Sequence, residues 1–209
     1  MAGDPVSELL ALASAPLGAE HADAAIALDG PLGSDLRAML RRANGFYAFE
    51  SALHVFPSGA TGMVGLEVWN ASELWRSEYD GLADDLVFFA EDVFGGQFVL
   101  SPEGVGTFDP ETGDVALLAE DLQGWAAVVL DDRDVLTGYP LAHEWQAQHG
   151  ALPSGQRLLP RVPFVLGGDF AVSNLYCAGA VDGMRTRANL ATQLRDLPDG
   201  ATVTYRIIE

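Results

Sequence analysis

The chain has 209 residues, and 49% of them are hydrophobic, which is enough to bury a full core without metals or disulfides. It carries 30 acidic residues against 11 basic ones, a formal net charge of −19, and every basic residue is an arginine. Such a charge repels nucleic-acid phosphates and therefore disfavours direct binding of DNA or RNA. The single cysteine, Cys177, has no disulfide partner within the chain, so a reducing cytoplasm is the expected setting.

The negative charge is concentrated in the middle of the chain. Residues 71–134 contain 16 acidic residues and 2 arginines, whereas residues 135–209 contain 6 of each. An uneven acidic field attracts basic proteins and speeds their encounter. Solubility alone is the alternative explanation, because acidic surfaces keep proteins dispersed.

The sequence shows no membrane-spanning segment and no secretory signal. Its densest apolar stretches, at 86–90 and 125–130, are far shorter than the roughly 20 residues that a spanning helix needs. The alanine-rich stretch at 9–28 lacks a basic leader and contains Glu20, His21 and Asp23. We therefore expect a cytoplasmic protein without membrane contacts.

Two helices are predicted near the N-terminus, separated by a loop at 18–33. Asp4-Pro5 provides an N-cap acceptor followed by proline at the first helical position. Ser34 can cap the second helix, which an Asn-Gly pair at 44–45 ends. The apolar residues of this helix recur at helical spacing: Leu36, Met39, Leu40 and Ala43.

The period then changes towards two, which is typical of strands. Residues 46–57 predict one or two strands with a turn near Glu50 and Ser51. Asn70, with Glu73 three residues on, is a capping arrangement that predicts a short helix through Tyr79.

The clearest pattern is a series of four short strands at 86–91, 97–100, 105–108 and 115–118. Their connections are tight and rich in Gly, Pro and Asp, as antiparallel hairpins require. We expect a meander with one face on the core, the other in water, and an acidic rim.

The rest of the chain predicts more helices and a small extension. Asp121 caps a helix that is interrupted at Asp131-Asp132, and Pro140 restarts one. Residues 150–163 contain three prolines and predict a linker. An apolar piece at 175–178, a helix at 181–197 and a strand at 202–208 follow. The expected fold is α+β, with a twisted antiparallel meander sheet packed with several helices, a domain at 1–150 and a C-terminal helix-strand extension at 151–209, packed on it.

No residue pattern predicts catalysis or a cofactor. His143 and His149 are six residues apart, so their rings diverge on a helix, unlike the i, i+4 pair of zinc proteases. His54 lies in a strand-like run, and apolar neighbours surround Cys177, so packed roles are expected for both. The four tryptophans, at 69, 75, 125 and 145, are expected in the core.

Metal binding has little support in the sequence. Glu91-Asp92, or the acidic residues at 131, 132 and 134, could offer oxygen ligands to Ca²⁺ or Mg²⁺. The segment DDRDVLTG lacks the spacing of an EF-hand loop, and a solvated turn is the simpler interpretation. We therefore predict no catalytic, cofactor or metal site.

Two blocks of the sequence resemble the SUKH superfamily of Smi/Knr-like domains. LRAMLRRANGFYAFESALHVFP is similar to its helix, Asn-Gly stop and strand. VWNASELW, followed by DLVFFAEDVFGGQFVLSPEGVGTFD, is similar to its central block. The matching positions are Asn44, Gly45, Trp75, Phe89, Glu91, Asp92, Gly95, Gly96 and Phe98, and the resemblance covers roughly residues 34–130. PLGSDL departs from the usual Leu-Pro before the first helix.

The resemblance implies a non-enzymatic protein-binding module. Bacterial members are commonly immunity proteins that neutralise a cognate toxin, often a nuclease, and an acidic face would cover its basic cleft. The candidate partner-binding residues are acidic: Asp84, Asp85, Glu91, Asp92, Asp131, Asp132 and Asp134. A housekeeping or regulatory adaptor remains an alternative, as does a cryptic enzyme or small-ligand binder with a deep pocket at His54 or His143.

Overall fold

The computed structural model describes residues 3–19, 30–59 and 62–197. Over these residues the fold is α+β, as predicted, with a six-stranded antiparallel sheet in the order β1-β2-β3-β4-β5-β6 and a two-stranded sheet β7-β8. The strands are β1 (Phe46–Ala48), β2 (Leu53–Val55), β3 (Val87–Glu91), β4 (Gln97–Ser101), β5 (Gly104–Phe108), β6 (Val115–Ala119), β7 (Gln156–Pro160) and β8 (Leu175–Gly179). The helices are α1 (Pro5–Ala11), α2 (Gly30–Arg42), α3 (Leu66–Trp69), α4 (Leu122–Asp131), α5 (Arg133–Thr137), α6 (Tyr139–His149) and α7 (Ala180–Leu194), with 3₁₀ turns η1 (Arg76–Tyr79), η2 (Phe164–Leu166) and η3 (Val172–Asn174).

The predicted meander is confirmed. Strands β3 to β6 begin and end within one residue of the bounds expected from the alternating pattern, and each pairs antiparallel with the next. The strand signal is reliable here because short Gly-, Pro- and Asp-rich connections separate residues of high β-propensity.

The expectation that one face of the meander lies in water is wrong for β3, although the residues of β6 at the edge are largely exposed. Adjacent residues of β3 point to opposite faces, and both faces are covered. Phe88 contacts Trp75 with ring centroids 4.8 Å apart, whereas Phe89 contacts Trp125 of α4 at 5.0 Å. The continuous apolar run of β3 is therefore that of a strand buried on both sides.

The N-terminal helices follow their capping signals only in part. Asp4 caps α1, and its carboxylate accepts a hydrogen bond from the Ser7 N–H at 3.1 Å. Helix α2 begins at Gly30, four residues before Ser34, so the prediction that Ser34 caps it is wrong. Leu36, Met39 and Leu40 are buried on its inner face, as their spacing predicts.

The prediction that a helix starts at Asn70 is also wrong. Asn70 instead follows the last residue of α3, and its side chain bridges to β3. Its Nδ2 donates to the Phe88 carbonyl at 2.8 Å and its Oδ1 accepts from the Phe88 N–H at 2.9 Å. Only a short 3₁₀ turn, η1, forms at the end of this segment, and Tyr79 is its last residue.

The segment predicted as a linker contains a buried strand. Within 150–163, β7 pairs with β8, and the Leu158 N–H donates to the Val93 carbonyl at 2.8 Å. Pro153 precedes β7, Pro160 is its last residue and Pro163 follows it, so the prolines do not interrupt the pairing. The strand predicted at 202–208 lies outside the described residues.

The two sides of position 150 share their apolar packing. Met184 and Ala188 of α7 are fully buried in the main core with the meander strands. A second cluster joins Val93 and Trp145 to Leu158 and Leu175.

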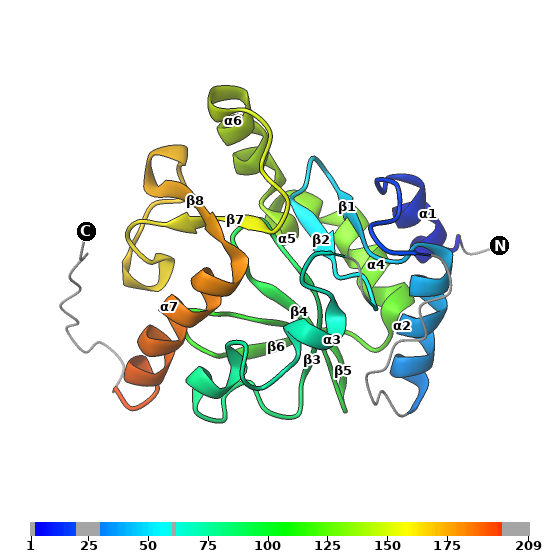
Figure 1. Cartoon of the computed structure of the whole chain (residues 1–209), viewed down its shortest axis with the longest axis horizontal. Helices are drawn as coiled ribbons and strands as arrows, with labels where there is room; N and C mark the ends of the chain where they lie inside the picture. Colours follow the sequence, from blue (N-terminus) through cyan, green and yellow to red (C-terminus); the bar gives the residue numbers. More distant parts are fainter. Residues whose placement is uncertain (1–2, 20–29, 60–61, 198–209) are drawn as a thin grey trace.

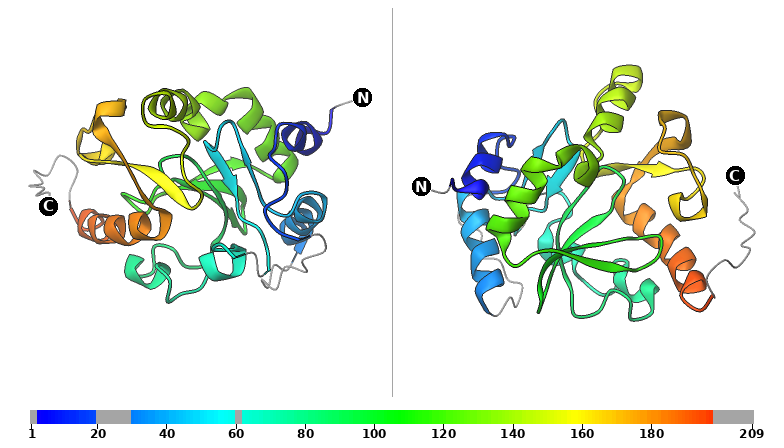
Figure 2. Two further views of the ribbon diagram at one scale, coloured as in Figure 1. Left: turned by 45° about the horizontal axis from the view of Figure 1, so that its top comes forward. Right: turned by 180° about the vertical axis from the view of Figure 1, so that it is seen from behind.

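Figure 1 shows the large sheet between α1 and α2 at one end and α7 with β7 and β8 at the other. The same order, mirrored, is seen from behind in Figure 2. Among the helices of the described residues, each is too short or too polar to cross a membrane.

Candidate functional site

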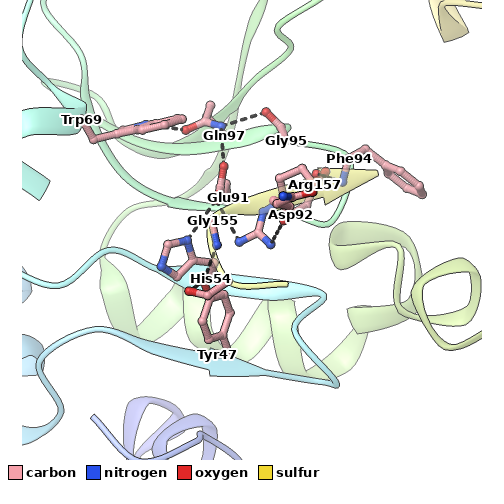
Figure 3. Close-up of polar contacts among 12 residues, drawn as sticks. Tyr47, His54, Trp69, Glu91, Asp92, Phe94, Gly95, Gln97, Gly155 and Arg157 are labelled. Atoms are coloured by element: carbon pink, nitrogen blue, oxygen red, sulfur yellow. Dashed lines mark hydrogen bonds and ion pairs between the residues drawn. The ribbon is translucent and has the colours of Figure 1, made fainter. Parts of the chain in front are cut away.

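A buried ion cluster, formed by His54, Glu91 and Arg157, lies where β2, β3 and β7 meet (Figure 3). The Glu91 Oε1 atom lies 2.9 Å from His54 Nδ1 and 2.8 Å from Arg157 Nη2. The three residues are at most 3% exposed. Arg157 therefore ties the C-terminal part of the chain to the end of β3.

Burial and charge pairing together set the protonation states in this cluster. Burial raises the pKa of Glu91, but Arg157 and the hydrogen bond with His54 outweigh it, so the net shift is downward and the carboxylate is ionised. Burial lowers the pKa of His54 despite Glu91, so the ring is neutral at pH 7. Because an ionised carboxylate can only accept hydrogen bonds, His54 Nδ1 carries the proton and donates a hydrogen bond to Glu91.

Neighbouring side chains hold the cluster in place. Gln97 donates to the Gly95 carbonyl at 2.8 Å and accepts from Trp69 Nε1 at 2.9 Å (Figure 3). Tyr47 stacks on His54 with centroids 4.4 Å apart, and the Arg157 guanidinium lies 5.7 Å from the centre of the same Tyr47 ring. Because its three members are at most 3% exposed, we interpret the cluster as a structural link between β2, β3 and β7.

The next residue, Asp92, organises the β3–β4 turn. Its Oδ1 accepts from the backbone N–H of Phe94 at 2.7 Å and of Gly96 at 2.8 Å. The residue keeps some exposed surface, but burial of its carboxyl raises its pKa to about 7. Gly95, at φ +80°, allows Arg187 to approach, because a Cβ there would lie 2.6 Å from Arg187 Nη2.

A cleft of about 250 Å³ opens beside this turn. We call it the acidic cleft. It is lined by the β3–β4 turn, the end of β5, α5, the 164–170 segment and α7. Acidic residues Asp92, Asp109 and Glu111 line it together with Arg187.

Three phenylalanines form one wall of the acidic cleft. Phe164 and Phe170 stack with centroids 4.0 Å apart and an interplanar angle of 3°. Phe94 meets them edge-on, at 5.4 and 6.1 Å. Phe170 is 67% exposed, so this wall presents a large aromatic surface to solvent.

Glu111 lies at the inner side of the acidic cleft. It is only 3% exposed, and its Oε2 accepts from the Val165 N–H at 2.8 Å. Its Oε1 has no hydrogen-bond partner among the described residues. Burial raises the pKa of Glu111, against the stabilising hydrogen bond from Val165.

The structure divides the predicted partner-binding residues among separate places. Glu91 is buried, so the prediction that it contacts a partner is wrong: its partners are His54 and Arg157. Asp92 lines the acidic cleft. Asp84 and Asp85 are exposed before the start of β3, and three exposed residues belong to the α4–α5 region: Asp131, Asp132 and Asp134.

The remaining sequence candidates offer no catalytic arrangement. The cavity beside His54 measures about 50 Å³, room for about one or two water molecules. His143 is exposed and pairs with Glu50 at 2.9 Å, while His149 stacks on Trp145. Burial raises the pKa of Cys177.

Within 3–19, 30–59 and 62–197, no group of three or more acidic, His or Cys residues could hold a metal ion. All four tryptophans are buried, as predicted.

Several residues of the acidic cleft and the ion cluster have no sequence pattern that predicts a functional role. Glu111 lies in a turn, DPETGD, that reads as solvated, and Phe170 and Arg187 are distant from it in sequence. Arg157 had a local signal, since a single arginine precedes the apolar run LLP. Its pairing with Glu91 depends on tertiary contacts alone.

The comparisons with known proteins support the fold and no activity. No protein-family model and no curated protein matches this sequence. Among solved structures, Atu4351 from Agrobacterium tumefaciens has a TM-score of 0.51 and 14% sequence identity, with 86% of each chain covered. At that identity the likeness concerns the arrangement of the chain.

Proposed function

We propose that this protein is a cytoplasmic, non-enzymatic protein-binding module of the SUKH type. In this proposal it acts as an immunity protein that neutralises a basic cognate toxin, such as a nuclease, by covering its functional surface. Neither nucleic acid nor a membrane is a partner in this hypothesis.

The observation that carries the proposal is a surface on which exposed apolar side chains lie near exposed acidic residues. Val135 of α5 and Phe170 line the acidic cleft and are 74% and 67% exposed. Asp131, Asp132 and Asp134 are exposed beside Val135 in sequence. Aromatic anchors with a polar, charged rim are typical of protein interfaces, and acidic rims favour basic partners.

Co-expression tests this proposal. The protein is produced in a bacterium together with each neighbouring reading frame of its native genome, and growth is scored. Rescue from a toxic neighbour supports immunity, and a Phe170→Asp variant should lose the rescue while Leu117→Asp, an exposed apolar site on β6, keeps it. Growth arrest with every toxic neighbour, despite folded protein, contradicts the proposal.

A housekeeping adaptor would use the same surface, and only the identity of the captured partner separates it from an immunity protein.

A small-ligand binder has one supporting observation. Asp92, with a pKa of about 7, and Glu111, with a raised pKa, line one cleft, and carboxyl groups with shifted pKa values occur at ligand and catalytic sites. Small-molecule sites generally measure about 300–1,000 Å³, and the acidic cleft, at about 250 Å³, lies just below this range.

A further inference from the structure

We infer that the acidic cleft receives an arginine side chain of the partner, with the guanidinium against Phe170 and paired with Glu111. This inference rests on the proposed function, because it assigns the contact by which the partner is recognised.

The charges lining the acidic cleft favour a cation. Three carboxyl groups, of Asp92, Asp109 and Glu111, line it against one guanidinium, that of Arg187. That guanidinium is already engaged: Nε donates to the Gly183 carbonyl at 3.0 Å and Nη1 to the Phe94 carbonyl at 2.7 Å. Its Nη2 lies 3.9 Å from the Met184 sulfur. Arg187 also lowers the pKa values of Asp92 and Glu111 and so offsets part of their charge, but three carboxyl groups face a single guanidinium.

Glu111 supplies the anchoring acceptor. Oε2 is held by the Val165 N–H, which fixes the carboxyl group, while Oε1 is buried without a partner among the described residues. A buried acceptor without a donor is unfavourable, and a charged donor entering the acidic cleft would remove this cost. An arginine N–H is such a donor.

The aromatic wall favours guanidinium over ammonium. A planar guanidinium stacks on an aromatic face and also presents parallel donors to a carboxylate. Phe170 is exposed, and its stacking on Phe164 fixes the direction of its ring. The segment that carries both rings is itself held by Asn174, which binds Val162 N–H at 2.9 Å and the Asp169 carbonyl at 3.1 Å.

The test uses small probes, so it does not require the partner. N-acetyl-arginine-N-methylamide is titrated into ¹⁵N-labelled protein, alongside the lysine derivative and the citrulline derivative, which keeps the shape and removes the charge. We expect saturable shifts of the Val165 and Phe94 amide signals with arginine by about 10 mM, weaker shifts with lysine, and none with citrulline.

Two variants with matched controls locate the contact. Glu111→Gln keeps an oxygen for the Val165 N–H and should weaken arginine binding by roughly tenfold or more, because a charged hydrogen bond is lost. Phe170→Ala should weaken it several-fold. Glu103→Gln and Leu117→Ala, at exposed sites on other hairpins, should leave it unchanged.

The outcomes separate this inference from the proposed function. Absence of shifts with arginine, equal binding of citrulline or lysine, or full binding by Glu111→Gln overturns the arginine site, whatever the rescue assay gives. Arginine binding without rescue from any toxic neighbouring gene product keeps the site and contradicts the immunity role.

Discussion

Arg157 is fully buried and joins two parts of the chain that lie far apart in sequence. Its Nη2 lies 2.8 Å from Glu91 Oε1, and its Nη1 donates to the Gln156 carbonyl at 2.9 Å. Replacing a buried ion pair by apolar groups can be neutral, but removing one partner leaves an uncompensated charge. The pairing therefore makes the fold depend on Arg157 more than on any exposed arginine.

Arg157→Met should lower the free energy of unfolding by about 3–5 kcal/mol, because Glu91 is left buried and unpaired. Urea denaturation followed by circular dichroism measures this change. Arg161→Met, at an exposed arginine of the same segment, is the matched control and should cost less than about 1 kcal/mol. Equal losses in both variants would contradict the role given to the ion pair.

Asp92 should make stability fall as the pH rises. Its pKa of about 7 in the folded state exceeds its ordinary value of 3.8, so between these values the folded state keeps a proton that the unfolded state releases. The contribution of Asp92 is thus favourable at low pH, is lost between about pH 4 and 7, and stays lost above.

Asp92→Asn keeps the Oδ1 acceptor for the turn and removes this titration. Relative to the wild type, its stability in urea should increase as the pH rises from about 4 to 7 and then level off. Asp114→Asn, at an exposed turn residue, provides the control. A difference between Asp92→Asn and wild type that is constant across this range would show that Asp92 does not titrate there.

At the scale of elements, the β1–β2 turn has a strained backbone and contacts α6. Phe49, Glu50 and Ser51 have φ values of 53°, 54° and 69°, which disfavour residues other than glycine. Glu50 pairs with His143 at 2.9 Å, and its carbonyl accepts from Gln146 at 2.8 Å. Contacts with α6 thus accompany a backbone conformation that the local sequence disfavours.

Ser51→Gly should raise the free energy of unfolding by roughly 0.5–1 kcal/mol, because glycine tolerates the positive φ. Ser77→Gly, in η1, should lower it by a similar amount, because there glycine only increases the freedom of the unfolded chain. Thermal and urea unfolding of both variants measure the changes. A loss of stability in Ser51→Gly would show that the turn is not strained at this residue.

At the scale of the whole molecule, the exposed acids among the candidate partner-binding residues lie towards the two ends of β3. Asp84 and Asp85 precede this five-residue strand, whereas α5 lies near its far end, where the Val93 N–H donates to the Thr137 carbonyl at 3.2 Å. At about 3.3 Å per residue the two groups are separated by roughly 16 Å or more. That distance exceeds the Debye length of about 8 Å at physiological salt, so the groups act separately on a partner.

The acids of the α4–α5 region are next in sequence to Val135 of the proposed interface. We therefore expect the steering of a basic partner to depend on this group more than on Asp84 and Asp85. Asp131→Asn/Asp132→Asn should slow association with the toxin found by co-expression several-fold and flatten its salt dependence. Asp84→Asn/Asp85→Asn changes the net charge equally at the other end of β3 and should have a smaller effect. Stopped-flow association rates at several salt concentrations measure both. Equal effects would indicate steering by net charge alone.

The sequence by itself determined the α+β class, the bounds of β3 to β6, the Asp4 and Asp121 caps and the burial of the tryptophans. These features depend on local periodicity, turn residues and caps, which act over a few residues. The prediction that Asn70 caps a helix was wrong, because its side chain forms hydrogen bonds with the Phe88 backbone instead.

Only the tertiary structure decided where the charges lie. Glu91 and Asp92 are adjacent in sequence, yet Glu91 is buried in an ion cluster and Asp92 lines a cleft, because successive residues at a strand end point in different directions. The acidic cleft combines Phe94, Glu111, Phe170 and Arg187, which no local pattern relates. Long-range packing brings them together, and a single sequence carries no periodic signal of such contacts.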